Sequence, residues 1–126
     1  MLNLSICGLD HTLIDLLNKM IKYVSIKNSD KPDKRMVAVF YDENKQRVKT
    51  THFGYQNTQT GKYGSTYIDH NDDKKKDNYI KRHAVNENFN DYISAGSLSR
   101  YILWNRKTLQ SSINDYMNKF NLKRYS

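Results

Sequence analysis

Residues 36–54 place the strongest constraint on the fold of this 126-residue chain. Residues 36–41 are apolar and rich in side chains that favour strands, and residues 42–45 are typical of a turn. Residues 46–54 then alternate polar and apolar side chains, as a strand with one buried face does. The pattern predicts a β-hairpin, and residues 65–69 are a candidate third strand.

The segment before the hairpin carries apolar side chains at the spacing of a helix. This stripe predicts an amphipathic helix over about residues 10–24, with Asp10 as its cap, followed by a polar connector over 27–35. We expect the stripe to close the core, with an interface to another chain as the alternative. The stripe consists of Leu13, Leu16, Leu17, Met20, Ile21 and Val24.

Three further segments show helical periodicity, over residues 72–85, 95–104 and 108–120. With the hairpin they predict the α+β class: a small antiparallel β-hairpin or three-stranded sheet packed against three to four helices. The length fits a single domain over residues 1–126, in which residues 1–33 hold the first helix and the connector. Six side chains are expected in the core: Phe40, Val48, Leu98, Ile102, Ile113 and Phe120.

Lysine and arginine outnumber aspartate and glutamate by 21 to 13, which gives a formal charge of +8. A basic surface favours a polyanionic partner, such as nucleic acid or an acidic protein face. The cations are densest in the predicted helix 72–85, where lysines would attract phosphates and a tyrosine would stack on a base. An ordinary solvated helix is the alternative, because Asp72, Asp73 and Asp77 offset three of the charges. The candidate nucleic-acid-binding residues are Lys74, Lys75, Lys76, Tyr79, Lys81, Arg82 and Arg100.

The sequence offers no spaced set of catalytic or metal-binding residues. Cys7 is the only cysteine, and His70 and His83 lie thirteen residues apart, far from the three- or four-residue spacing of a helical zinc site. A hairpin-plus-helix metal nuclease built on His52, His83 and Asn86 is a distant alternative. We therefore expect no catalytic residue, no metal and no cofactor. No apolar run reaches the roughly 20 residues of a membrane span, so no membrane association is expected.

Several strings along the chain carry a family resemblance. They occupy residues 39–40, 48–54, 67–70, 79–83, 86–91, 95–105 and 112–116. With them the chain resembles a family of small proteins encoded by giant nucleocytoplasmic DNA viruses of the mimivirus and phycodnavirus type. The resemblance covers a core over residues 36–122. It implies a viral setting, in the viral factory of the host cytoplasm and in the virion, and it implies no particular reaction.

The expected function is that of a non-enzymatic, basic viral accessory protein that binds nucleic acid, DNA more readily than RNA. Packaging in the virion, beside other virion proteins, belongs to this expectation. A structural virion or minor capsid interaction protein is the alternative. Its contact would be Trp104 or the apolar stripe of the first helix, because tryptophan is enriched in protein interfaces.

We predict that the purified protein hydrolyses neither DNA nor RNA in the presence of Mg²⁺, Mn²⁺ or Zn²⁺. The reason is that its histidines and carboxylates do not form a spaced ligand set. A gel assay with labelled single-stranded and duplex substrates measures this. Hydrolysis that is abolished both by a chelator and by His83→Ala would show instead that the protein is a nuclease.

Overall fold

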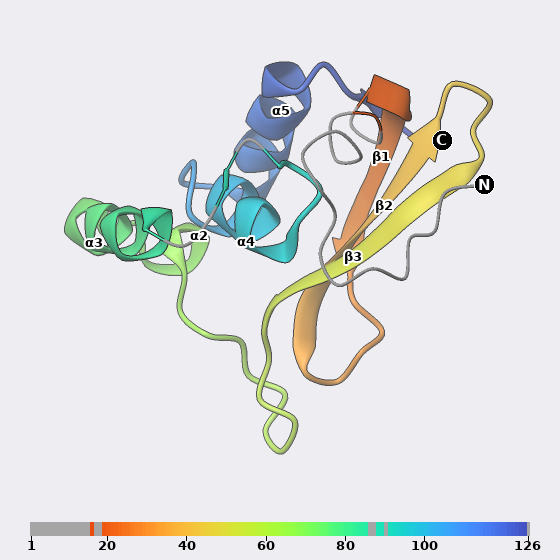
Figure 1. Ribbon diagram of the computed structural model, residues 1–126. Helices are drawn as coiled ribbons and strands as arrows, with labels where there is room; N and C mark the ends of the chain where they lie inside the picture. The colour runs from red at the N-terminus through yellow and green to blue at the C-terminus, as the bar shows by residue number, and fades with distance from the viewer. Residues whose placement is uncertain (1–15, 17–18, 86–87, 90, 126) are drawn as a thin grey trace.

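The computed structural model of the protein describes residues 16, 19–85, 88–89 and 91–125. Four strands form one sheet in the order β3-β2-β1-β4 (Figure 1). β1 (Ile21–Asn28), β2 (Lys34–Asp42) and β3 (Arg47–Tyr55) pair in antiparallel fashion. The short β4 (Lys123–Arg124) pairs with β1 in parallel.

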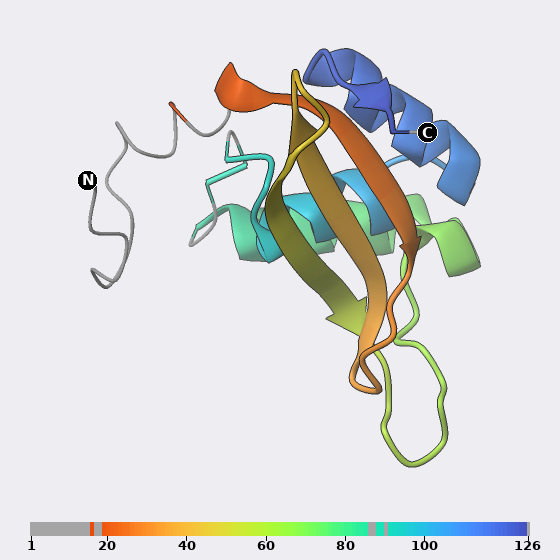
Figure 2. The same cartoon turned by 90° about the vertical axis from the view of Figure 1, so that its right-hand side faces the viewer.

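The helices lie on one side of the sheet (Figure 2). α4 (Ala95–Leu98) continues directly into a π-helical turn, η1 (Ser99–Leu103), which packs against α5 (Leu109–Lys119). α2 (Tyr67–His70) leads into α3 (Asp73–Ala84), and α3 lies farther from the sheet than α4 does (Figure 1). The α+β prediction is confirmed, with a mostly antiparallel sheet of four strands.

β1 corrects the prediction of a helix over residues 10–24. Met20 is still helical, but Ile21 and Val24 lie in β1, and most of the preceding segment is outside the described residues. Side chains three residues apart share a face of a helix, whereas in a regular strand they point to opposite faces. A β-bulge between Ile21 and Tyr23 adds one residue, so both Ile21 and Val24 reach the buried face. The same spacing therefore fits a bulged strand as well as a helix.

The third strand predicted at residues 65–69 is also wrong, because this segment starts α2. The Thr66 backbone N–H donates a hydrogen bond to the Asp69 carboxylate at 2.8 Å, and the Thr66 hydroxyl donates to the same carboxylate at 2.7 Å. A threonine that meets an acidic side chain three residues later favours a helix start over a strand. The predicted β-hairpin is confirmed as β2 and β3.

The core lies between the sheet and the layer formed by α4, η1 and α5. Of the six predicted core residues, Phe40, Leu98, Ile102 and Ile113 are buried, as predicted. The other two, Val48 and Phe120, are only partly buried but pack against the same cluster. Among the described residues, no helix is long and apolar enough to cross a bilayer.

A cluster of aromatic rings completes the core. Tyr92 and Ile93 are buried, although most of the residues from 86 to 94 are polar. The Tyr92 ring stacks on Phe120 with the ring centroids 4.6 Å apart, and the Tyr116 hydroxyl donates a hydrogen bond to the Tyr92 carbonyl at 2.7 Å. The tyrosines thus fill space with their rings while each buried hydroxyl needs a polar partner.

We expect Phe40→Ala to lower the free energy of unfolding by about 3–5 kcal/mol, because Phe40 is fully buried at the centre of the core. Urea unfolding followed by far-UV circular dichroism measures the change. Val85→Ala is the control, since Val85 is 81% exposed and its truncation should change stability by less than about 0.5 kcal/mol. Equal stability of the Phe40→Ala variant and the wild type would contradict the core described above.

Candidate nucleic-acid interface

An ion pair fixes α2 to the sheet. Arg35, at the start of β2, donates two hydrogen bonds to the Asp69 carboxylate, at 2.8 and 2.9 Å. The Arg35 guanidinium also lies 4.4 Å from the centre of the Tyr63 ring. Burial alone would raise the pKa of Asp69, but the hydrogen bonds from Arg35 and Thr66 outweigh it and hold the pKa at about 2.

α3 begins immediately after α2 because Asn71 turns the chain in the left-handed conformation, with φ of 55°. The Asp72 side chain then accepts hydrogen bonds from the backbone N–H groups of Lys74 and Lys75, which caps the new helix. The Asn71 amide donates to the Lys107 carbonyl at 3.0 Å and so ties this corner to the chain before α5. The direction of α3 is thereby set by its first residues.

A row of stacked rings runs along the inner side of α3. Trp104 and Tyr79 lie parallel, with an interplanar angle of 3° and centroids 4.3 Å apart. Tyr79 also stacks on His83 at 4.2 Å, and the His70 ring meets Trp104 edge-on at 5.4 Å. Trp104 holds this position because it ends η1, where its backbone N–H donates to the Ser99 carbonyl at 3.1 Å.

Beside Trp104 the surface is hollowed to a volume of about 270 Å³, which we name the Trp104 pocket. Lys75, Asn78 and Arg82 lie along one face of α3, since they are three and four residues apart. The pocket is lined by Ser65, His70, Lys75, Asn78, Arg82 and Trp104. A hollow with an aromatic wall and two cations suits a flat, anionic ligand.

His70 lines this pocket and carries a buried ring nitrogen. Its Nδ1 atom accepts a hydrogen bond from the Asp72 backbone N–H at 2.9 Å, so in the neutral ring the proton sits on Nε2. Nε2 is buried and has no hydrogen-bond partner among the described residues. A buried donor without a partner is uncommon and calls for an explanation.

The predicted binding residues fall into three groups. Four cations are exposed on α3: Lys74, Lys75, Lys81 and Arg82. Tyr79 is buried between Trp104 and His83, so its ring serves as a support for Trp104. The side chains of the other two predicted residues, Lys76 and Arg100, are directed towards residues 104–105, where the chain turns back after η1.

Lys76 and Arg100 hold that reversal in place. The Lys76 ammonium donates to the Asn105 carbonyl at 2.6 Å and lies over the Tyr67 ring at 4.8 Å. The Arg100 guanidinium donates to the Trp104 carbonyl at 3.1 Å. Burial lowers the pKa of both groups. These contacts give both residues a structural role, and their part in binding nucleic acid stays a prediction.

The sequence reasoning did not assign Trp104, His70 and Asn78 to the binding site. The spacing of Lys75, Asn78 and Arg82 is a signal that could have found Asn78, because these three positions share one helix face. No local signal could have found Trp104, which reaches α3 only through the fold.

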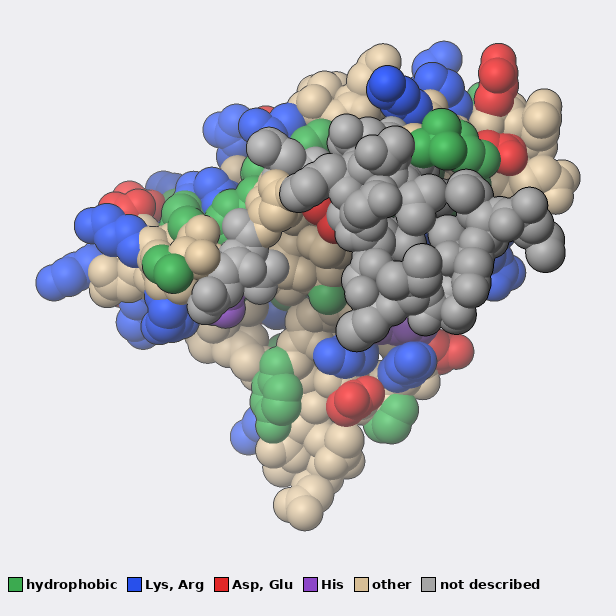
Figure 3. Space-filling model, in the orientation of Figure 1, with side chains coloured by type: hydrophobic (Ala, Val, Ile, Leu, Met, Phe, Trp, Pro, Cys, Tyr) green, Lys and Arg blue, Asp and Glu red, His purple; other side chains and the backbone are tan. Residues whose placement is uncertain are grey.

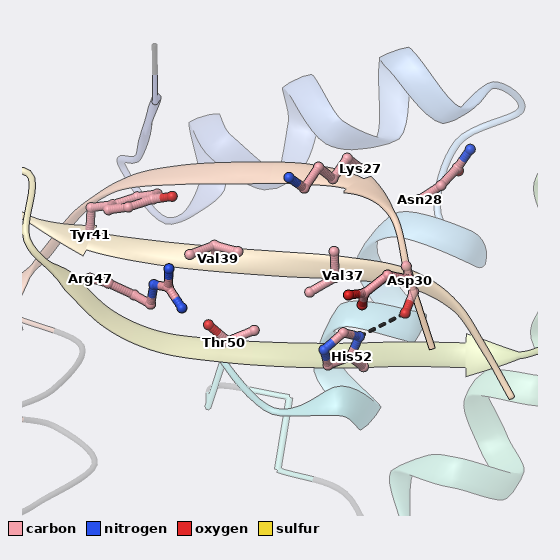
Figure 4. Close-up of a pocket in the computed structure, with 10 residues that line it drawn as sticks. Lys27, Asn28, Asp30, Val37, Val39, Tyr41, Arg47, Thr50 and His52 are labelled. Atoms are coloured by element: carbon pink, nitrogen blue, oxygen red, sulfur yellow. Dashed lines mark hydrogen bonds between the residues drawn. The ribbon is translucent and has the colours of Figure 1, made fainter. Parts of the chain in front are cut away.

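A second, larger hollow of about 620 Å³ lies on the face of the sheet opposite the described helices (Figure 4). Val37 and Val39 form its floor, and His52 at one end is hydrogen-bonded to the Ser29 hydroxyl at 2.7 Å. Its charges are mixed, because Asp30 accompanies its cations, and its one tyrosine already stacks on Tyr125. We therefore treat the Trp104 pocket as the candidate site.

Among the described residues, no group of three or more histidine, cysteine, aspartate or glutamate side chains is placed to hold a metal ion. In particular, His52 bonds to Ser29 on the sheet, whereas His83 stacks on Tyr79 in α3.

In a comparison with known families, residues 24–83 match a family of unknown function (DUF5754). The matched part runs from β1 to the end of α3, so it contains the Arg35–Asp69 ion pair and the exposed cations but not Trp104. The match does not link the chain to giant viruses. No curated protein and no solved structure matches the chain.

We predict that Asp69→Asn lowers the free energy of unfolding at pH 7 by about 1 kcal/mol, a modest value because the carboxylate is partly open to solvent. The folded pKa of about 2 lies below the ordinary 3.8, so Asp69 stabilises the fold above pH 4 and loses this effect as the pH falls towards 2. Urea unfolding at pH 7 and at steps between pH 4 and 2 measures both effects.

Glu43→Gln, in the exposed turn of the hairpin, is the control for the loss of one carboxylate. An Asp69→Asn variant as stable as the wild type at pH 7 would show that the ion pair with Arg35 does not hold α2 in place.

Proposed function

We propose that this protein binds nucleic acid through the exposed cations of α3, Lys74, Lys75, Lys81 and Arg82. The observation that carries the proposal is the placement of these four side chains on one short, firmly capped helix beside the Trp104 pocket. Figure 3 shows the lysine and arginine side chains gathered over α3 at the left of the view. Such a cluster attracts phosphates and releases counterions on binding.

The charge balance of α3 supports this proposal. The helix contains five lysine and arginine residues against two aspartates. One of these, Asp73, accepts a hydrogen bond from the Tyr67 hydroxyl, which points it towards α2. Lys76 points inward, so the exposed charges of α3 and its cap are four cations and three aspartates, which leaves a small positive charge for phosphate to meet.

The remaining parts of the proposal rest on the sequence. We propose that the protein binds without catalysis and prefers DNA to RNA, and the basic composition supports binding to a polyanion. The resemblance to giant-virus proteins supports a viral setting with packaging in the virion. None of these features is implied by the family match, whose family has no known function.

A protein-interaction role in a virion is the second candidate. In the apolar stripe, Ile21 and Val24 are buried, whereas Leu16 and Met20 are exposed, and Trp104 is only partly buried. The rings of Tyr55 and Tyr63, which are 63% and 46% exposed, offer a further contact. They flank the loop that projects from the end of β3 (Figures 1 and 2), and tyrosine is enriched in interfaces.

The test replaces two exposed cations that lie outside the pocket. We expect Lys74→Gln with Lys81→Gln to weaken binding to DNA by at least about tenfold at 50–100 mM salt. The slope of log affinity against log salt should fall by about two, one for each lost phosphate contact. Fluorescence anisotropy of a labelled oligonucleotide measures both. Lys76 stays unchanged, because its ammonium supports the fold.

Lys27→Gln with Arg47→Gln is the matched control, since it removes the same charge from the open face of the sheet. Its effect on the affinity should be less than about threefold. The proposal fails if the wild type binds neither DNA nor RNA at 50–100 mM salt, where a basic binder should reach roughly micromolar affinity. It also fails if the two double variants weaken binding equally.

A further inference from the structure

We infer that the Trp104 pocket receives one unpaired base, and that the protein therefore binds single-stranded nucleic acid in preference to duplex. This inference rests on the proposed function, because the cations of α3 supply the contacts to phosphate. It adds a site for the base and the two residues that hold it, Trp104 and Asn78.

The size of the pocket favours a single flat group. Its volume of about 270 Å³ lies just below the range of roughly 300–1,000 Å³ that is common for sites of drug-sized ligands. One wall is the Trp104 ring, whose orientation is fixed by the parallel Tyr79 ring at 4.3 Å. A base that stacks on Trp104 would extend an existing row of rings, and stacking of this kind accepts any base.

Polar groups around the pocket match the edge of a base. The Asn78 amide, which is exposed on α3, offers both a donor and an acceptor. The His70 ring also lines the pocket, but its Nε2 atom is buried, so the hydrogen bonds to a base fall to the exposed Asn78 amide. The pocket thus combines an aromatic face with hydrogen-bonding groups, which is how unpaired bases are held in proteins.

The two cations of the pocket are placed for the phosphates next to the base. Lys75 and Arg82 are seven residues apart on α3, so their Cα atoms are separated by about 10 Å along the helix axis. Each can therefore reach a phosphate on one side of an inserted nucleotide. In a duplex the bases are paired and stacked, and a base would have to be flipped out before it could enter the pocket.

The intrinsic fluorescence of the protein reports on this pocket, because Trp104 is the only tryptophan in the sequence. We expect a single-stranded oligothymidine to quench the Trp104 fluorescence, with the same dissociation constant that anisotropy gives. A duplex of equal length should bind at least about fivefold more weakly and leave the fluorescence nearly unchanged, as stacking of one base on an aromatic ring changes affinity by roughly 5- to 150-fold. An abasic oligonucleotide, which keeps the phosphates, should behave like the duplex.

A substitution at the pocket rim separates base contact from phosphate contact. Asn78→Ala should weaken binding to the single strand by at least about threefold and leave binding to the duplex unchanged. Asn118→Ala is the matched control, because Asn118 is an exposed asparagine on α5. Thermal melting of both variants checks that the fold is intact.

The outcomes distinguish this inference from the proposed function. If single strand and duplex bind equally well, or if the single strand binds without changing the fluorescence of Trp104, the base pocket is wrong while nucleic-acid binding stands. If neither polymer binds at 50–100 mM salt, where a basic binder should still bind, the proposed function fails and this inference fails with it.

Discussion

The hydrogen-bonded ion pair between Arg35 and Asp69 joins the two parts of this molecule. The sheet and the layer of α4, η1 and α5 share one apolar core, which includes no side chain from α2 or α3 apart from a contact by Ile68. α3 has a single buried residue, Tyr79. Hydrogen bonds and ion pairs must therefore hold this helix in place. The Arg35–Asp69 ion pair fixes the position at which α2, and after it α3, leaves the sheet.

This mode of attachment divides the cations of α3 and η1 into two kinds. Lys76 and Arg100 satisfy backbone carbonyl groups at the chain reversal, where unpaired carbonyls would be costly. The exposed cations of α3 are left for solvent or a ligand. A helix that is held by its inner lysine can present its outer lysines in fixed positions, which reduces the entropy lost when phosphates bind.

The local sequence pattern correctly predicted those elements whose hydrophobic spacing fits only one kind of secondary structure. The alternation over residues 46–54 predicted the strand β3, and the helical spacing over residues 72–85 predicted α3. The pattern failed at β1, where a bulge makes the spacing of a strand resemble that of a helix. It also gave no sign that Tyr92 and Ile93, which follow several polar residues, belong to the core. In both places the deciding contact comes from a distant segment, and propensity gives way to it.

The sequence by itself determined the fold class, the hairpin, the positive helix α3 and the cations that lie on it, because each depends on residues close together in the chain. Only the tertiary structure decided that Trp104 would stand beside Lys75 and Arg82. That meeting depends on the π-helical turn at η1, on the stacking of Trp104 on Tyr79, and on the hydrogen bond from Lys76 to Asn105. The stacking and the hydrogen bond join segments more than twenty residues apart, and the π-helical turn adds one residue to a helical turn. The spacing of residues along the chain does not encode such contacts.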